Sequence, residues 1–486
     1  MRPLSPKRIS ISAVCLVLGL SCGESAPGDA GAPDAGPEDA AFDAGPPPPA
    51  WPGRLPGAES LGERRGRSIS RAIVHVHSPL SHDACDGAGW VDGALADETC
   101  LANFRAALCA LRIDAAMITD HTPHLDEVGF EGALWIAEGD EPVTNAAGDV
   151  IASRMACPDG HRVLLTVGSE NVLMPLGLER HPGDPSDPEA VRAIYEGGDA
   201  ASIAGLREAG ALIWQAHTEE RTVEELRARD LDGLELYNLH ANVDPGIREE
   251  HLGLDPAGFL PALLDFTRPA LRLPPDLALL AFLEPNRPAL DRWDTLLADG
   301  LRVSGSGGCD AHENALPMEL ADGERADSYR RMMYWIQNHL LVDDDSPEAA
   351  KAALGAGRFY VTSEIFGPPV GFDFVARDAE TGGDAEMGET ASVGDTLRVV
   401  APALPEDWPQ DPPPVVTLRL FRAQDGGAVE VATSDGVTLE HVTTEPGAYR
   451  VEVWIAPEHA RPFLGTRADR LLRDVVWVYS NPIFIE

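Results

Sequence analysis

Residues 75–312 carry histidine, aspartate and glutamate side chains in short motifs of a kind that binds metal ions. The motifs are His75 and His77, His82, Asp120 and His121, Glu170, His217, residues 235–238, and Asp310 with His312. Imidazole nitrogens and carboxylate oxygens are protein ligands of divalent ions such as zinc, manganese and iron. Ions held in this way activate water for hydrolysis. The motifs therefore predict a metal-dependent hydrolase with a small-molecule substrate rather than a binding module.

Each motif is weak evidence by itself, because an isolated histidine is more often structural than a ligand. Because several motifs occur in one order at the ends of predicted strands, we interpret them together as metal ligands. Glu235 has a second interpretation, since a strand carboxylate could pair with arginine or lysine inside the fold. The acidic pairs 219–220 and 249–250 are interpreted as solvated surface. The remaining histidines are interpreted as structural: His124, His161, His251, His339, His441 and His459.

The motifs lie in a region, residues 67–365, where strand and helix patterns alternate. Valines alternate with His75 and His77, which predicts a strand with both histidines on one face. Apolar residues at helical spacing come next, over 101–111. Further strands are predicted at 115–118, 163–167, 212–214 and 234–237. Strands separated by helices predict a parallel sheet and favour a barrel. Catalytic groups of barrels gather at the carboxyl ends of the strands.

The C-terminal boundary of this domain is predicted from a helix start and a change of pattern. Ser346, Pro347 and Glu348 are typical of a helix start, and this helix is expected to close the domain. Beyond residue 366 the chain has short β-rich runs between Gly, Pro and Asp turns. They lie at 396–400, 415–420, 429–432, 449–455 and 475–479. Residues 366–486 are therefore predicted to form a small β-sandwich.

The ordered motifs resemble those of the PHP family, the polymerase and histidinol phosphatase type of metallohydrolase. The C-terminal β-rich part and the closing residues 480–483 resemble the branch that includes the carbaryl hydrolase type. The resemblance implies an α/β fold: a distorted seven-stranded β/α barrel followed by the β-sandwich. It also implies a centre of two or three divalent ions, which would be zinc, manganese or iron.

The resemblance also implies a role for each motif residue. His75 and His77 match the opening His-x-His, and His82 is the third-metal candidate with Asp83 as its rival. Asp120 is expected to orient a neighbouring imidazole, and Asp120 and Asp310 are the expected catalytic residues. The family's histidine between Glu170 and His217 is matched by His181, with His240 as the alternative. The expected metal ligands are His75, His77, His82, His121, Glu170, His181, His217, Asp310 and His312.

Two metal ions that share a carboxylate would lower the pKa of bound water and supply a metal-bound hydroxide. Adjacent ions favour a phosphoester substrate. The likeness to the carbaryl hydrolase type favours an ester, amide or carbamate instead. A second alternative is a catalytically inactive exported binding protein. No Gly-x-Ser-x-Gly motif and no P-loop points to another hydrolase mechanism.

The N-terminus predicts export. Basic residues, an apolar run at 11–20 and then Cys22 resemble a bacterial lipoprotein signal, with the signal peptide at 1–21 and Cys22 lipidated. Residues 22–66, rich in Asp, Ala, Gly and Pro, are predicted to be a disordered linker. The protein is expected to be a membrane-tethered lipoprotein, periplasmic or on the cell surface, or otherwise secreted. The membrane would be reached only through Cys22.

Charge and cysteine content agree with a protein outside the cytoplasm. The net charge of -41 argues against nucleic acid as a partner, because no basic surface is available for phosphates. A disulfide between Cys85 and either Cys100 or Cys109 is plausible, and buried unpaired cysteines are the alternative. No Cys-x-x-Cys pair is present, which argues against a cysteine-based zinc site. Protein partners are not predicted.

Overall fold

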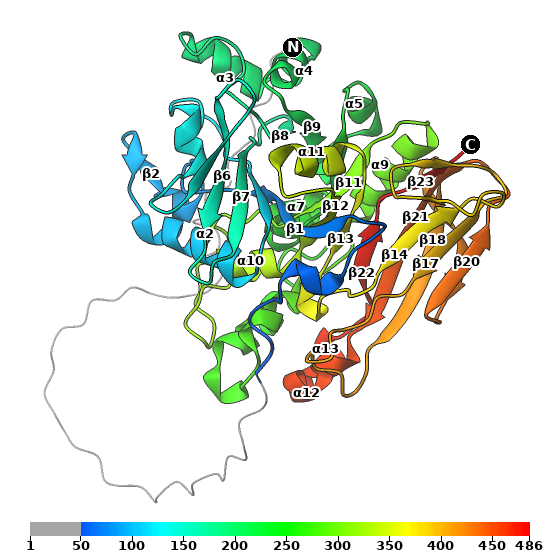
Figure 1. Cartoon of the computed structure of the whole chain (residues 1–486). Helices are drawn as coiled ribbons and strands as arrows, with labels where there is room; N and C mark the ends of the chain where they lie inside the picture. Colours follow the sequence, from blue (N-terminus) through cyan, green and yellow to red (C-terminus); the bar gives the residue numbers. More distant parts are fainter. Residues whose placement is uncertain (1–49) are drawn as a thin grey trace, which may run out of the picture. The chain divides into compact units, whose positions relative to one another are not determined.

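Two β-sheets meet at the end of strand β1 in the computed structural model, which describes residues 50–486. The predicted signal peptide, Cys22 and the linker as far as residue 49 lie outside the described residues. In the larger sheet, β1 (Ser68–Val76), β4 (Ala115–Ile118) and β7 (Arg162–Val167) are parallel neighbours (Figure 1). Their mainly buried, apolar residues are typical of parallel strands covered on both faces.

The smaller sheet has four strands in the order β11 (Ser304–Gly308), β10 (Gly233–Asn238), β9 (Leu212–Gln215) and β8 (Met174–Leu176). The first three are parallel, and β8 is antiparallel to β9. Two isolated bridges join this sheet to the larger one, Val76 with Ala311 and Val167 with Leu178. The carboxyl ends of β1 and β11 therefore lie next to each other.

Helices connect these strands, and most begin with a polar capping side chain. The longer helices are α2 (Glu98–Ala110), α3 (Pro188–Glu196), α4 (Ala200–Glu208), α9 (Arg287–Ala298) and α11 (Pro347–Gly355). The predicted helix start at Ser346 is confirmed, because its side chain accepts a hydrogen bond from the Ala349 amide. In the part of the chain that the structure describes, no helix is both long and apolar enough to span a bilayer.

The larger sheet continues beyond the predicted domain boundary. Its 13 strands include β5 (Glu141–Thr144), β6 (Val150–Ala156), β12 (Gln337–Val342) and β13 (Phe359–Thr362) on one side of that boundary. From the C-terminal part it includes β16 (Thr390–Ala391), β18 (Val415–Gln424), β19 (Gly427–Ser434), β21 (Gly447–Ala456), β22 (Val475–Ser480) and β23 (Ile483–Ile485). The connection is the antiparallel pair β13 and β22.

A separate four-stranded sheet completes the C-terminal part. It consists of β15 (Asp384–Ala385), β14 (Asp373–Arg377), β17 (Thr396–Val400) and β20 (Thr438–Val442) (Figure 1). The mixed α/β class predicted from the sequence is confirmed. The seven-stranded barrel, the β-sandwich and the boundary between them stay predictions.

The described part of the predicted linker, residues 50–66, packs against the folded protein. Trp51, Leu55 and Leu61 are buried. The carbonyl oxygen of Pro52 accepts a hydrogen bond from the Tyr334 hydroxyl at 2.5 Å. The prediction of a disordered spacer is therefore wrong for residues 50–66, because they contribute apolar side chains to the core.

Two disulfides connect loops to the core. Cys85 pairs with Cys100, which is one of the two expected partners, and Cys109 pairs with Cys157. Cys309 is a buried free thiol, and burial raises its pKa to about 12.

A buried ion pair joins β1 to the turn after β13. The Arg71 guanidinium donates to both carboxylate oxygens of Glu364, at 2.5 and 3.0 Å, and both side chains are fully buried. Burial alone would raise the pKa of Glu364, but Arg71 and His339 together lower it to about 2. Removing one partner would leave an uncompensated charge in the interior.

We expect Arg71→Met to lower the unfolding free energy by about 3–5 kcal/mol, measured by guanidinium denaturation. Arg154→Met is the control, because the Arg154 partner Asp345 has an 86% exposed side chain. An exposed pair should contribute about 0–1 kcal/mol. Equal losses in the two variants would contradict this interpretation.

Candidate metal centre

His75 and His77 lie at the carboxyl end of β1, where the two sheets meet. Both imidazoles are fully buried. The His77 amide donates to the Ala311 carbonyl at 3.1 Å, and the Asp310 amide donates to the His75 carbonyl at 3.1 Å. These backbone bonds hold the His-x-His motif beside the Asp-x-His motif that comes after β11.

Four donor atoms converge at this junction. His75 Nε2 lies 3.1 Å from His77 Nε2, 3.1 Å from Glu170 Oε2 and 3.1 Å from Asp310 Oδ1. His77 Nε2 lies 3.2 Å from each of the same two oxygens. Ligands about 2.0–2.1 Å from a tetrahedral ion are separated by roughly 3.3 Å. The four atoms therefore have the spacing of a metal coordination shell.

A second group of donors shares His77 with the first. It consists of His77, Asp83, His121 and His312. Asp83 Oδ2 lies 3.5 Å from His121 Nε2 and 3.5 Å from His312 Nε2. Because one imidazole belongs to both groups, the two groups are adjacent.

His217 lies beside Glu170 and Asp310, the two carboxylates of the first group. Its Nε2 atom is 3.4 Å from Glu170 Oε1 and 3.2 Å from Asp310 Oδ2. Glu219 Oε1 lies 3.0 Å from His217 Nδ1, and Glu219 is buried. The interpretation of Glu219 as solvated surface is therefore wrong, because a short turn after β9 directs it inward. His217 and Asp310 both have left-handed backbone, with φ of 47° and 52°.

The structure does not bring His181 into the cluster. Its Nδ1 is 2.8 Å from the Tyr195 hydroxyl and its Nε2 donates to the Val128 carbonyl at 2.9 Å. Both ring nitrogens are thus used. The alternative residue, His240, belongs to a third donor group with Asp310 and His312. The sequence around His181 contains no signal that it is not a ligand, because its position depends on how the loop after β8 folds.

Asp83, the rival of His82 in the sequence, is a member of the second group. The His82 side chain is exposed and its ring lies 5.2 Å from the His121 ring. Asp120 is buried and accepts hydrogen bonds from the Ser78 amide and hydroxyl, both at 2.6 Å. Burial raises the pKa of Asp120 to about 7. Asp120 therefore holds the residue after His77 and forms no hydrogen bond to an imidazole within residues 50–486.

The carboxylates and imidazoles of the centre strongly affect one another's protonation. Burial lowers the pKa of His77, but the Asp310 and Glu170 carboxylates outweigh burial and raise it to about 9. Burial raises the pKa of Glu170, but His75 and His77 bring it well below its usual range. The carboxylates therefore require nearby positive charge, which either protons or cations can supply.

The donor set fits a divalent cation. Asp310 Oδ1 is buried and receives no hydrogen bond from the described residues. A buried carboxylate oxygen without a hydrogen bond is destabilising unless another group compensates its charge. Nitrogen and oxygen donors of this kind suit zinc, manganese and iron.

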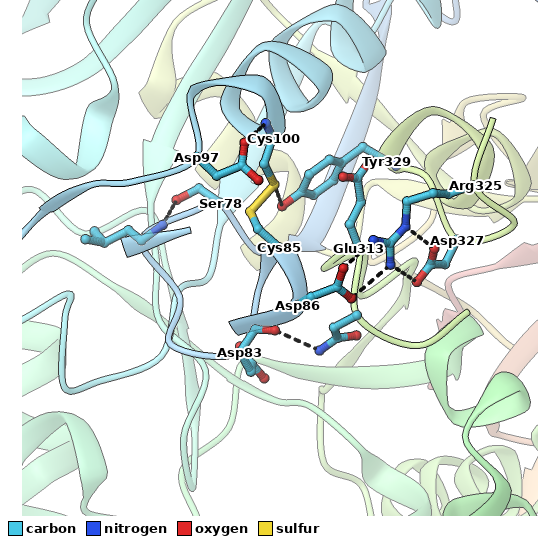
Figure 2. The surroundings of a disulfide bond; sticks show 12 residues. Ser78, Asp83, Cys85, Asp86, Asp97, Cys100, Glu313, Arg325, Asp327 and Tyr329 are labelled. Atoms are coloured by element: carbon cyan, nitrogen blue, oxygen red, sulfur yellow. Dashed lines mark hydrogen bonds and ion pairs between the residues drawn. A yellow bond between two sulfur atoms is a disulfide. The ribbon is translucent and has the colours of Figure 1, made fainter. Parts of the chain in front are cut away.

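A disulfide-bonded loop carries Asp83. Figure 2 shows Asp83 just before Cys85, which is bonded to Cys100 at the start of α2. The Cys85 amide donates to the His312 carbonyl at 2.8 Å, and Arg325 pairs with Asp86 at 2.6 Å. The loop is thus attached both to α2 and to the segment that contains His312.

We expect His77→Ala to remove most of the bound metal, because His77 belongs to both four-residue groups. Elemental analysis of purified protein would measure the metal content per chain. His181→Ala is the matched control and should keep the metal content of the wild type. Unchanged metal in His77→Ala, or loss of metal in His181→Ala, would contradict this geometry.

We expect replacement of Cys85 and Cys100 by serine to weaken binding at the group containing Asp83, while the group containing Glu170 keeps its ion. Titration with Zn²⁺ against a chelator would separate the two affinities. Replacement of Cys109 and Cys157 by serine is the control. It should lower thermal stability and leave the Zn²⁺ affinity of both donor groups unchanged. Equal metal affinities in all three proteins would show that the Cys85–Cys100 bond does not support the site.

Comparison with known proteins yields one distant structural similarity. No known family model matches the sequence, and no curated protein matches it. The chain is similar to the crystal structure of a two-domain protein from Bacteroides vulgatus described as containing a predicted PHP-like metal-dependent phosphoesterase. The match has 12% identity and a TM-score of 0.33 and covers 87% of this chain and 98% of the other. Membership of a family does not follow from a similarity this low.

Proposed function

We propose that this protein is a metal-dependent hydrolase and that its substrates are phosphoesters. The observation that carries the proposal is the pair of adjacent donor groups that share His77. When bound there, divalent ions supply Lewis acidity and lower the pKa of water. Two adjacent ions suit phosphoryl transfer because both the attacking and the leaving oxygen can be stabilised.

The side chains of the centre have distinct roles in this proposal. Glu170 Oε1 lies beside His217, and its Oε2 lies beside His75 and His77, so Glu170 would hold an ion in the first group. Asp310 presents Oδ1 and Oδ2 in the same way, and we assign it both a ligand and a catalytic role. Asp120 acts as a positioning residue behind His77.

We also propose that residues 67–365 form the distorted barrel of the PHP family. Seven strands follow one another in a closed ring, in the order β1, β4, β7, β8, β9, β10 and β11. Five of the seven contacts between neighbours are strand pairs, and the isolated bridges Val167–Leu178 and Val76–Ala311 supply the other two. This order and the ligand motifs support the family. Assignment to the carbaryl hydrolase-like branch and a β-sandwich at 366–486 are part of the same proposal.

One observation favours the alternative substrate class of neutral esters, amides or carbamates. Within residues 50–486, no lysine or arginine pairs with Asp83, Glu170 or Asp310. A phosphomonoester brings more negative charge to a site that already contains several carboxylates. A neutral carbonyl substrate would avoid this repulsion.

We expect the Zn²⁺- or Mn²⁺-loaded protein to hydrolyse p-nitrophenyl phosphate or bis-p-nitrophenyl phosphate and to lose this activity with a chelator. Asp310→Asn should lower the rate by at least about tenfold, since it changes a ligand and a catalytic group together. Naphthyl esters and carbamates are the comparison substrates. Turnover of these without phosphate release would refute the phosphoesterase proposal, and inactivity of metal-loaded protein on every substrate would favour a binding role.

We further propose that the protein is exported and tethered through a lipidated Cys22, or otherwise secreted. The disulfides Cys85–Cys100 and Cys109–Cys157 support an oxidising compartment, because such bonds persist mainly outside the cytoplasm. The charge of -41 also supports the absence of a nucleic-acid partner.

A further inference from the structure

Glu235 is a buried carboxylate on β10, behind the donor atoms of the centre. Its side chain is fully buried, and its Oε1 atom lies 2.7 Å from His75 Nδ1. Its other oxygen accepts hydrogen bonds from the His217 amide at 3.0 Å and from Asn238 Nδ2 at 3.2 Å. Among residues 50–486 no arginine or lysine forms an ion pair with Glu235. Its partners are therefore residues of the metal centre.

Asn238 extends this contact to a third ligand. Its Nδ2 atom also donates to Asp310 Oδ2 at 3.1 Å. Its Oδ1 atom accepts from the Ala241 amide at 3.0 Å and caps α6 (Leu239–Val243). Because the Asn238 side-chain oxygen accepts the capping hydrogen bond, its amide nitrogen faces the carboxylates of Glu235 and Asp310. Glu235 and Asn238 thus connect the ends of β1, β9 and β11.

The contact between Glu235 and His75 determines how His75 presents its second nitrogen. A carboxylate accepts a hydrogen bond from Nδ1–H, so a neutral His75 carries no proton on Nε2. That Nε2 atom is the one that lies 3.1 Å from Glu170 and Asp310. A carboxylate in this position also raises the basicity of a metal-bound imidazole.

Gly308 provides the space for this arrangement. A Cβ atom at position 308 would collide with Glu235 Oε1 and would lie 3.0 Å from the His75 Cβ atom. Gly308 is the last residue of β11, directly beside β10. A side chain here would displace the Glu235 carboxylate from His75 while leaving its charge in place.

We infer that Glu235, with Asn238 and Gly308, is the positioning device that sets the tautomer of His75 and aligns three ligands from different strands. This inference rests on the proposed metal centre and goes beyond it. Carboxylates behind metal-bound histidines typically change metal affinity by about 10–100-fold. Glu235 is expected to act on the group that contains Glu170 and to have little effect on the group that contains Asp83.

The test compares Glu235→Gln with Glu452→Gln by Zn²⁺ titration against a chelator and by the visible spectrum of Co²⁺-loaded protein. Glu452 is a matched control, because it is also fully buried but bonds to Arg450 and Trp454 on β21. We expect Glu235→Gln to weaken Zn²⁺ binding at the group that contains Glu170 about 10–100-fold and to shift the Co²⁺ bands. Glu452→Gln should reduce stability and leave both metal readouts unchanged.

Gly308→Ala gives a second test that keeps every charge. It should weaken the same Zn²⁺ site and shift the same Co²⁺ bands. Wild-type affinity and spectrum in folded Glu235→Gln and Gly308→Ala proteins would overturn the inference. Loss of metal in Glu452→Gln to the same extent would also overturn it. The proposed function is tested by a different measurement. It would be contradicted if wild-type protein that retains its metal did not hydrolyse phosphoesters.

Discussion

Two carboxylates buried side by side, Glu170 and Asp310, impose the main electrostatic constraint on this protein. Both lie in one group of donor atoms that are all within 4.8 Å of one another. Charges of the same sign in the interior are strongly unfavourable unless opposite charge and hydrogen bonds compensate them. The imidazoles of His75, His77 and His217 surround the pair, and protons or cations supply the balancing charge. The arrangement is stable only if the surrounding scaffold is rigid.

The scaffold meets this requirement by bringing strand ends together. Parallel strands place their carboxyl ends at one edge, and the bridge between Val76 and Ala311 joins the two sheets beside the donors. Backbone hydrogen bonds between the His-x-His and Asp-x-His segments then hold His77 and Asp310. The loop with Asp83 has no strand to position it, and the Cys85–Cys100 disulfide takes over that role. Rigid strands and a covalently attached loop thus contribute to the same site.

Glu235 and Glu219 are buried carboxylates that contact imidazoles of the centre. Glu235 contacts His75, and Glu219 contacts His217. His75 and His217 therefore each lie between two carboxylates, one at each ring nitrogen. This alternation of charge explains why so many acidic groups can be buried within one small region.

The sequence was sufficient to predict the α/β class, the helix start at Ser346 and the convergence of His75, His77, His121, Glu170, His217, Asp310 and His312. These depend on local patterns: apolar periodicity specifies strands, and the order of parallel strands brings their ends together. The membership of Asp83 in the second group, the separation of His181 and the burial of Glu219 depended on loop paths. Only the tertiary structure decided these points, because a loop side chain is oriented by distant contacts that leave no periodic signal. The same reason applies to residues 50–66, whose few apolar side chains become core only when Tyr334 and the rest of the interior are in place.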